Sequence, residues 1–289
     1  MIFSHITTTP GEVTSITQVR DYISSPLALY SLLDKPNSLL LESAEIDSKD
    51  SVKSLILVDS ALRIVCHGKH VTLTAQSNNG KQLLPYLQSH VQNCDAVLIE
   101  DTLTLTYNEV ASDIDEASKL IADNAFSALR SCINSIKSTT DNPFSVFLGG
   151  VFAYDMVANF ETLSDVPGGE NSCPDYVFYL AETLVIIDHQ AKTTELIGNV
   201  FNGPEVHANC FEVGQQLERL NNVCDNAAQY QGQKQNGASP VSVDVSDEQY
   251  CEHVIKLKKE HCRWRYLPSR TITYFFSCLP RFTSCLQPT

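Results

Sequence analysis

Strand-like segments follow one another between residues 38 and 77, and this run constrains the fold more than any other feature. Residues 53–60, 61–68 and 69–77 are rich in the aliphatic and β-branched side chains that strands favour. A tight turn at residues 67–69 joins the last two segments. Because strands joined by so short a connection pair antiparallel, we expect an antiparallel sheet at the centre of the fold.

Further strand-like segments are spread along the chain. They are 38–44, expected to be a buried strand; 96–101; 102–108, by its alternation; 144–154; and a hairpin formed by 176–189 with 193–201. Gly149 and Gly150 interrupt the segment 144–154, which predicts either a bend or a close approach by other backbone.

Helical periodicity predicts five helices. They are expected at 26–33, beginning at Pro26; at 79–92, with Leu83, Leu84, Leu87 and Val91 on one face; at 112–136, with Leu120, Ile121, Ala125, Leu129 and Ile133 on its apolar face; from Pro204 to Val223; and at 246–260, facing inward with Tyr250, Val254 and Leu257. Ser246 and Gln249 have the spacing of a capping box. Clustered strands with helices between them predict an α+β fold, with antiparallel sheets and packed helices.

The charge and the hydropathy of the chain exclude several classes of partner. A formal net charge of −14 argues against nucleic acid and against anionic membrane, because both require a basic face. No apolar run approaches the ~18 residues that span a bilayer, and residues 1–12 lack the pattern of a signal peptide. We therefore expect a cytoplasmic protein. Its 10 cysteines, without a CxxC pair, are expected to be small buried hydrophobes.

Chemistry-bearing motifs are weak when the residues are considered alone. The chain has no phosphate-binding GxxxxGK[ST], no GxSxG and no HExxH sequence. Four acids, Glu42, Glu45, Asp47 and Asp50, are either paired carboxylates or a solvated loop after a strand, and we favour the loop. Asp188 with His189, and Asp155, are each either a strand end or acid–base groups. The sequence therefore predicts no catalytic residue and no metal ligand.

Three segments carry a family resemblance. Residues 39–64 (LLLESAEIDSKDSVKSLILVDSALRI), 147–161 (FLGGVFAYDMVANFE) and 173–190 (CPDYVFYLAETLVIIDHQ) resemble, in order and spacing, segments of bacterial anthranilate synthase component I. The resemblance covers about residues 15–260. The GGxxxYD pattern alone also fits aminodeoxychorismate and isochorismate synthases, whereas LLLESAEIDSKD points to the tryptophan-pathway enzyme.

The resemblance implies a lyase reaction and a feedback inhibitor. Members of the family aminate chorismate with ammonia and release pyruvate, with Mg²⁺ holding the substrate carboxylate. A separate glutamine amidotransferase, component II, supplies the ammonia. L-Tryptophan inhibits by binding near the LLES motif. By that resemblance Ser43 contacts the inhibitor, with Glu42 and Ala44 beside it. The alternative is that Ser43 only ends a strand.

A second feedback-linked position of the family is an arginine in the helix expected at 112–136. It aligns with Ser127 here, and Arg130 lies one turn further along. This departure puts the strength of inhibition in doubt.

The resemblance also implies a domain organisation. Residues 1–228 correspond to the N-terminal regulatory domain, 229–245 to a linker, and 246–260 to the start of the chorismate-binding catalytic domain. Residues 261–289 differ in composition, with four arginines, no acid and the only tryptophan.

The family continues at this point with a segment like I-x-x-G-D-I-F-Q-V-V-P-S-R. Codons for 262–274 can be chosen so that a shift of one nucleotide reads Val-Ala-Gly-Asp-Ile-Phe-Gln-Val-Val-Pro-Ser-Arg. We interpret residues 261–289 as out-of-frame translation after a frameshift near His261, either genuine or a sequencing error. Arg270 then inherits no role from the family.

On this interpretation the chain is truncated before the catalytic domain. We expect it to bind no Mg²⁺ and to have no anthranilate synthase activity. The alternatives are a fragment that folds alone and binds tryptophan, and a fragment that aggregates through apolar surface.

Overall fold

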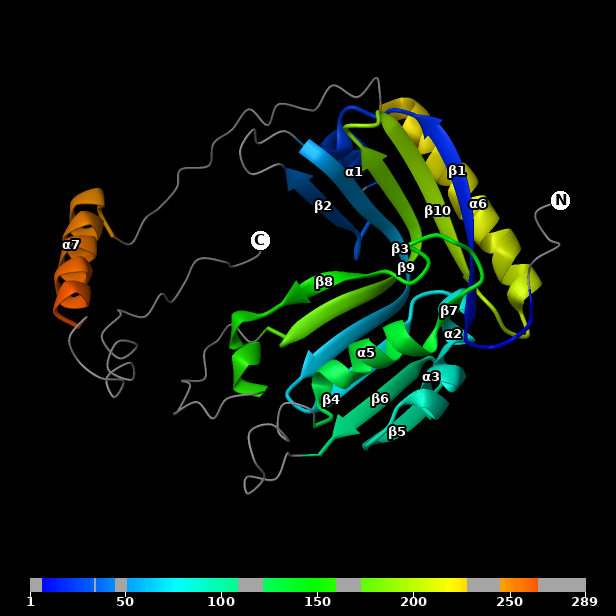
Figure 1. Cartoon of the computed structure of the whole chain (residues 1–289), viewed down its shortest axis with the longest axis horizontal. Helices are drawn as coiled ribbons and strands as arrows, with labels where there is room; N and C mark the ends of the chain where they lie inside the picture. Colours follow the sequence, from blue (N-terminus) through cyan, green and yellow to red (C-terminus); the bar gives the residue numbers. More distant parts are fainter. Residues whose placement is uncertain are drawn as a thin grey trace. The chain divides into compact units, whose positions relative to one another are not determined.

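The computed structural model describes residues 7–33, 35–44, 51–108, 122–159, 173–227 and 245–264 (Figure 1). The chain divides into two units. The first comprises residues 1–163 with 167–232, and the second comprises 164–166 with 233–289. No helix of the described part of the chain is long and apolar enough to cross a membrane.

The first unit is built on one curled, largely antiparallel sheet (Figure 1). Its strands are β1 (Glu12–Asp21), β2 (Leu39–Ala44), β3 (Ser51–His67), β4 (His70–Ala75), β5 (Cys94–Ile99), β6 (Thr102–Tyr107), β7 (Lys137–Ser138), β8 (Leu148–Phe152), β9 (Tyr176–Asp188) and β10 (Thr193–Phe201). The order is β5-β6-β4-β3-β9-β10-β1-β7, with β2 paired to β3 and β8 paired to β9. Among the described strand pairs, only that of β1 and β7 is parallel. The α+β fold with antiparallel sheet and packed helices is confirmed.

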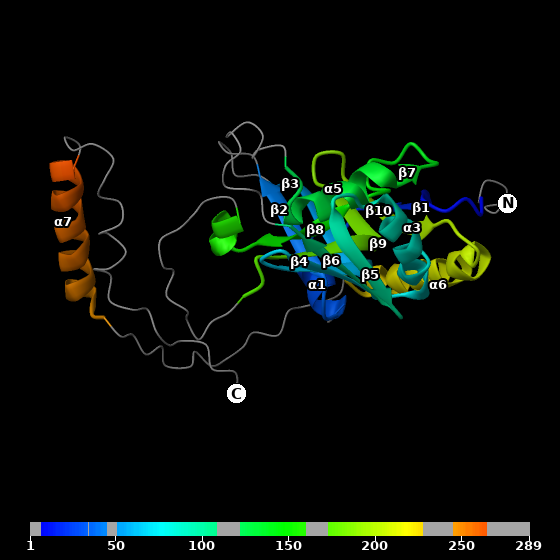
Figure 2. The same ribbon diagram turned by 90° about the horizontal axis from the view of Figure 1, so that it is seen from below.

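Helices cover different regions of this sheet. They are α1 (Pro26–Leu33), α2 (Asn78–Lys81), α3 (Leu84–His90), α5 (Ala125–Ser135) and α6 (Val206–Ala227). One core cluster joins α1 and α6 to β3, β9 and β10 through residues such as Leu29, Ile56 and Leu217. A larger cluster joins α3 and α5 to β3, β4 and β6. Figure 2 shows α5 on the opposite side of the sheet from α1 and α6.

The predicted strands 53–60 and 61–68 form one strand, β3, which runs for 17 residues. It pairs with β9 over nearly its whole length, and the register shifts between Leu57 and Leu62. Asp59 and Ser60 suggested a break here, but the stretch contains no glycine, proline or asparagine to form a turn. Irregular pairing of this kind bends a strand and increases its twist, which accounts for the curl of the sheet.

The prediction that 38–44 is a buried strand is wrong in its burial. β2 forms, but Leu41 is 42% exposed, and Glu42 and Ser43 are also exposed. β2 pairs with β3 along one edge, and no other described strand pairs with it. An aliphatic run alone therefore did not distinguish an edge strand from a central one.

The predicted helix 79–92 is two short helices, α2 and α3. Pro85 lies in the first turn of α3, where its missing N–H is tolerated. Because proline cannot donate the hydrogen bond that would continue a helix from the preceding residues, α2 and α3 are separate helices. Leu83, Leu84 and Leu87 are buried as expected. Val91 lies just beyond the helix, in an extended conformation.

The predicted helix 112–136 is described only from residue 122. Residues 122–124 are not helical, so the predicted helix is wrong there, and α5 begins after Asn124, which forms a capping box with Ser127. Ala125 and Leu129 are buried as predicted, whereas Ile133 is 49% exposed, so its assignment to the apolar face is wrong. Leu120 and Ile121 lie outside the described residues. β1 and β7 were not predicted from the sequence.

The remaining expectations in the first unit hold in part. The hairpin of β9 and β10 is confirmed, and so is the helix predicted from Pro204 to Val223, which forms as α6. Four of the described cysteines are buried, and burial raises the pKa of the Cys66 thiol to about 12. Cys173 and Cys251 are exposed, so the expectation of burial fails for them.

In the second unit, the described element is α7 (Asp247–Trp264). Its capping box is confirmed, because the Ser246 N–H donates to Gln249 Oε1 at 3.2 Å and the Gln249 N–H donates to Ser246 Oγ at 3.3 Å. The helix ends four residues later than predicted. Tyr250 is 62% exposed, so its predicted inward position is wrong, and no other described element of this unit packs against it. The predicted linker lies almost entirely outside the described residues, as does the tail from residue 265.

Candidate functional site

Ser43 lies near the end of β2, directly opposite Lys53 of β3. Its hydroxyl donates to the Lys53 carbonyl at 3.1 Å and accepts from the Lys53 N–H at 3.2 Å. The pairing register shifts between Ser43 and Ala44, and the hydroxyl bonds the backbone at this irregularity. A serine hydroxyl has one hydrogen and two lone pairs, so one acceptor position stays available on this exposed side chain.

Glu42 and Ser43 point to opposite faces of the sheet, because side chains alternate along a strand. Glu42 is opposite Ser54, whose hydroxyl donates to Glu42 Oε1 at 3.4 Å. Ala44 is paired with Ser51, and its side chain is not described. The structure therefore places Ser43 with Lys53 on one face, and the Glu42 carboxylate on the other.

Lys53 is a residue that the sequence analysis missed. Its Nζ lies 3.5 Å from Asp188 Oδ2, at the end of β9. Asp188 also accepts the N–H groups of Ala191 and Gln190 at 2.8 and 3.0 Å, and these bonds, the first most strongly, lower the pKa of its carboxyl. Asp188 thus ends its strand and caps the following turn, as the strand-end interpretation predicted.

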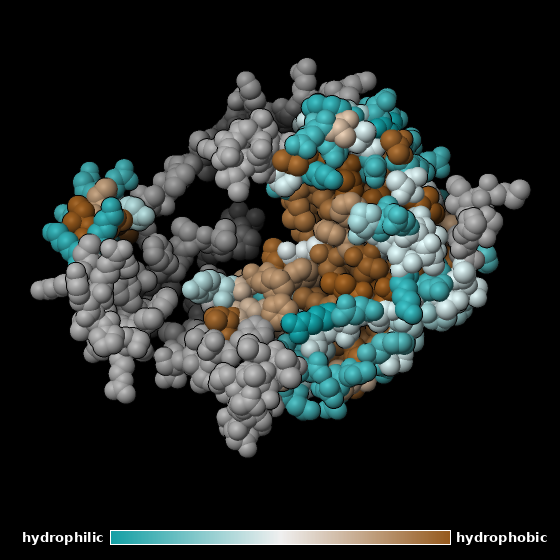
Figure 3. Space-filling model, viewed as in Figure 1, coloured by the Kyte–Doolittle hydropathy of each residue, from teal (hydrophilic) through white to brown (hydrophobic). Residues whose placement is uncertain are grey.

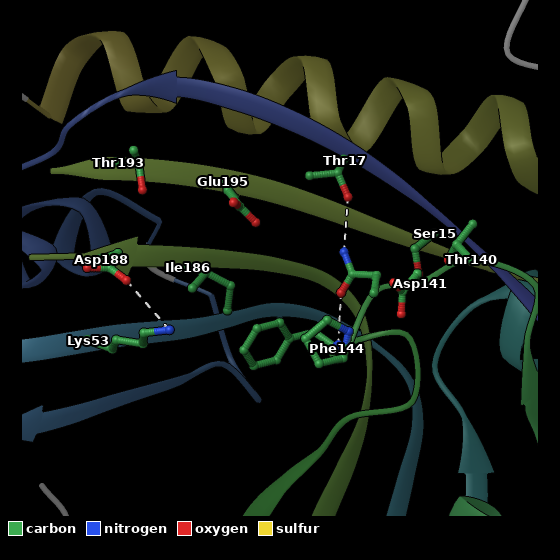
Figure 4. Close-up of a pocket in the computed structure, with 12 residues that line it drawn as sticks. Ser15, Thr17, Lys53, Thr140, Asp141, Phe144, Ile186, Asp188, Thr193 and Glu195 are labelled. Carbon is green, nitrogen blue, oxygen red and sulfur yellow. Dashed lines mark hydrogen bonds and ion pairs between the residues drawn. The ribbon is translucent and has the colours of Figure 1, made fainter. Parts of the chain in front are cut away.

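A pocket of about 510 Å³ opens on the same face of the sheet as Lys53 (Figure 4). Its lining is Ser15, Thr17, Lys53, Thr140, Asp141, Asn142, Pro143, Phe144, Ile186, Asp188, Thr193 and Glu195. Figure 4 shows the Lys53–Asp188 pair on one side and Thr17 on the other. Asn142 Nδ2 donates to Thr17 Oγ1 at 3.0 Å. Ile186 and Phe144 supply apolar surface between them.

The lining of this pocket is suited to a small molecule with charged and apolar parts. Lys53 offers a cation, while Asp141 and Glu195 offer carboxylates without a cationic partner in the described part of the chain. Hydroxyls and one amide line the rest. Such a mixture of a few polar groups with apolar surface is typical of small-molecule sites. Sequence reasoning could not find it, because Lys53 and Asp188 meet only through the register of β3 with β9.

The other candidate residues do not form a site. Glu45, Asp47 and Asp50 lie outside the described residues, as does the side chain of Asp155. Ser127 is buried; its hydroxyl accepts from the Asn124 N–H at 3.3 Å in the capping box and donates to Asp123 at 2.7 Å. Arg130 is exposed.

A magnesium site would need a cluster of oxygen ligands. No group of three or more His, Cys, Asp or Glu side chains that could hold a metal exists among residues described by the structure.

The chain belongs to the chorismate binding enzyme family, whose model matches residues 49–261.

Within that family it is homologous to anthranilate synthase component 1. It is 40% identical over 242 residues to that protein from Vibrio cholerae serotype O1, which covers 82% of this chain and 46% of the relative. It is 43% identical over 183 residues to the protein from Escherichia coli strain K12, covering 62% and 35%. The chain spans about half the length of such relatives or less.

A solved structure shows a weaker likeness. The crystal structure of anthranilate synthase component I from Streptococcus pneumoniae TIGR4 matches 68% of this chain and 34% of its own, with 16% identity and a TM-score of 0.29.

Proposed function

We propose that this chain is the effector-binding part of an anthranilate synthase component I, and that it binds L-tryptophan beside Ser43. The observation that carries the proposal is the exposed Ser43 hydroxyl, which keeps one acceptor position at the irregular end of β2. The ammonium group of an amino acid is a donor for that position.

The surroundings of Ser43 support an amino-acid ligand. Lys53 is directly opposite, so both side chains leave the same face of the sheet, with Cβ atoms about 5 Å apart. The Lys53 ammonium pairs with Asp188 in the chain without ligand. When a ligand binds, the same ammonium can pair with the ligand carboxylate instead. Apolar side chains on this face, among them Leu41 and Leu55, offer contact area for an indole ring. Figure 3 shows apolar surface gathered over this part of the sheet.

In the assembled enzyme, this binding acts as feedback inhibition. The reaction we propose for that enzyme is amination of chorismate with ammonia from a glutamine amidotransferase component II, followed by loss of pyruvate, with Mg²⁺ held outside the described residues. The 289-residue chain alone spans 46% of its Vibrio cholerae relative, and we propose that it does not catalyse this reaction. The names of the relatives favour this identity over aminodeoxychorismate synthase component I.

Thermal unfolding with and without ligand tests the effector role. A ligand that binds only the folded state raises the unfolding temperature with its concentration. We expect L-tryptophan to do so and D-tryptophan at the same concentration to do so far less. Equal curves with and without L-tryptophan would contradict the proposal.

Formation of fluorescent anthranilate from chorismate and an ammonium salt tests the catalytic statement separately. We expect none from the chain alone. Turnover by the chain would overturn the proposed lack of activity without bearing on the effector site.

A further inference from the structure

A chain of side-chain hydrogen bonds crosses the sheet behind Ser43. His189 Nδ1 lies 2.8 Å from the Tyr22 hydroxyl, and His189 Nε2 lies 2.8 Å from the Ser54 hydroxyl. Ser54 continues to Glu42 at 3.4 Å, and Lys192 Nζ lies 3.4 Å from the Tyr22 oxygen. Five residues from four parts of the sequence, with His189 and Lys192 in one turn, thus form one connected series.

We propose that His189 is a positioning residue for β2, and that it holds the Glu42 end of the strand through Ser54. The proposal rests on the proposed function only where it concerns tryptophan, since the hydrogen-bond series exists in the chain as it stands. The direction of the hydrogen bonds, from donor to acceptor, supports the proposal first.

With a neutral imidazole, one direction satisfies all five groups. A carboxylate accepts only, so the Ser54 hydroxyl donates to Glu42, and its oxygen is then the acceptor for His189 Nε2–H. A neutral imidazole has one N–H, which leaves Nδ1 to accept from the Tyr22 hydroxyl. Tyr22 in turn accepts from the Lys192 ammonium, which can only donate. The reverse direction would set lone pairs of Ser54 and Glu42 against each other.

The burial of Ser54 makes the series costly to break. Its side chain is completely buried, and a buried hydroxyl without partners costs more than its bonds contribute. Ser54 is opposite Glu42 in the β2–β3 pair, and the His189 N–H bonds the Val52 carbonyl at 3.0 Å. His189 is therefore fixed to β3 by its backbone and to Ser54 by its ring.

The ring of His189 is held on its other side as well. Tyr22 meets it edge to face, with centroids 5.8 Å apart, and Lys192 lies 4.5 Å from the centroid of Tyr22. These contacts fix the orientation of the imidazole, so the Nε2–H points at Ser54. Among the described strands, β2 pairs with β3 on one side and with none on the other. The hydrogen-bond series therefore attaches the Glu42 end of β2 to the sheet, in addition to the backbone pairing with β3.

Nitrogen-detected magnetic resonance of the ¹⁵N-histidine-labelled 289-residue chain tests the direction. The signal of His189 is the one lost in His189→Gln. We expect the hydrogen on Nε2, and a shift toward the other tautomer in Tyr22→Phe, which removes one hydroxyl and no core volume. A wild-type hydrogen on Nδ1 overturns the assigned direction.

Hydrogen exchange of the β2 amides tests the positioning role. We expect His189→Ala to exchange about tenfold faster than wild type in the β2 amides bonded to β3. His189→Gln keeps an N–H donor that can reach Ser54, and it should restore most of the protection. His70→Ala is the matched control, because His70 also bonds a hydroxyl, Thr106 at 3.2 Å, but on β4. Equal exchange in wild type and His189→Ala overturns the proposal. If His189→Ala does not fold, Tyr22→Phe replaces it, with a smaller acceleration expected.

Tryptophan titration of the same variants separates this proposal from the proposed function. We expect His189→Ala to bind about tenfold more weakly than wild type, and His189→Gln to recover most of that affinity. If wild type does not bind tryptophan, the proposed function fails, and the tautomer and exchange results still decide the role of His189. If wild type and His189→Ala bind equally while exchange differs, His189 positions β2 without influence on the ligand, which overturns the link to the effector.

Discussion

Ser43 and Lys53 hydrogen-bond each other twice across the end of the β2–β3 pair, in both directions, through one hydroxyl and one peptide unit. The hydroxyl thus stabilises the backbone at the register shift and still has one lone pair that can accept a hydrogen bond. A strand end and a ligand contact are therefore compatible roles for Ser43.

The structural role of Ser43 should be small. Ser43→Ala removes both bonds at an exposed position, where water can replace them, so we expect the free energy of unfolding to fall by about 0.5–1.5 kcal/mol. Urea unfolding measures this. Ser89→Ala is the matched control, since its exposed hydroxyl also bonds a carbonyl, that of Tyr86 at 2.7 Å. A loss far above this range would mean that Ser43 is needed for folding and that ligand effects of the variant cannot be assigned to the site.

Glu182 should make stability depend on pH. It is 1% exposed, and burial raises the pKa of its carboxyl above the ordinary 4.5, against hydrogen bonds from Ser77, Gln216 and Asn79. The folded state therefore holds the proton more tightly than the unfolded state. The stability from this proton is fully present below pH 4.5 and is lost as the pH rises through the folded pKa.

The Glu182→Gln variant has an amide in place of the carboxyl group, so this position does not titrate. We expect the stability of wild type relative to this variant to fall as the pH is raised from about 4 to 8. Denaturant unfolding at several pH values measures the difference, with Glu212→Gln on the exposed side of α6 as control. A difference that stays constant, or that grows in favour of wild type, contradicts the assignment.

Two glycines should respond to alanine in opposite directions. A Cβ on Gly150 would lie 2.2 Å from the Val177 carbonyl oxygen and 2.7 Å from Phe178 Cα, so we expect a loss of about 1–3 kcal/mol. A Cβ on Gly214, in α6, meets nothing within 4 Å, and we expect a gain of about 0.5–1 kcal/mol. Thermal unfolding of both variants decides this. Similar signs for the two would refute the close approach at β8.

Leu217 should be a main contributor to the packing of α6. It is completely buried in the cluster with Leu29 and Val185, so Leu217→Ala should cost about 2–5 kcal/mol of the unfolding free energy. Leu27→Ala, at 63% exposure on α1, should stay within about 0.5 kcal/mol. Equal effects of the two substitutions would mean that α6 does not pack on the sheet as described.

Local patterns predicted those elements whose side chains follow one period. The strand β6 alternates between buried and half-buried residues, and α6 buries positions three and four apart, so both could be predicted. The close approach at Gly150 was one of two interpretations of the double glycine, and the backbone of β9 accounts for it.

Elements decided by distant partners could not be predicted. The continuity of β3 depends on its pairing with β9, and the exposure of β2 depends on the absence of a second neighbouring strand among the described ones. The same holds for the site. Ser43 could be named through a family resemblance, whereas Lys53, Asp188 and His189 reach their places only through the β3–β9 register.

Calorimetric titration of the 289-residue chain with L-tryptophan tests the central claim most directly. We predict saturable binding of one tryptophan per chain, and an affinity reduced about tenfold or more in folded Ser43→Ala but unchanged in Ser89→Ala. A folded wild-type chain that gives no heat of binding, or a Ser43→Ala variant that binds as tightly as wild type, would contradict the placement of an effector site at Ser43.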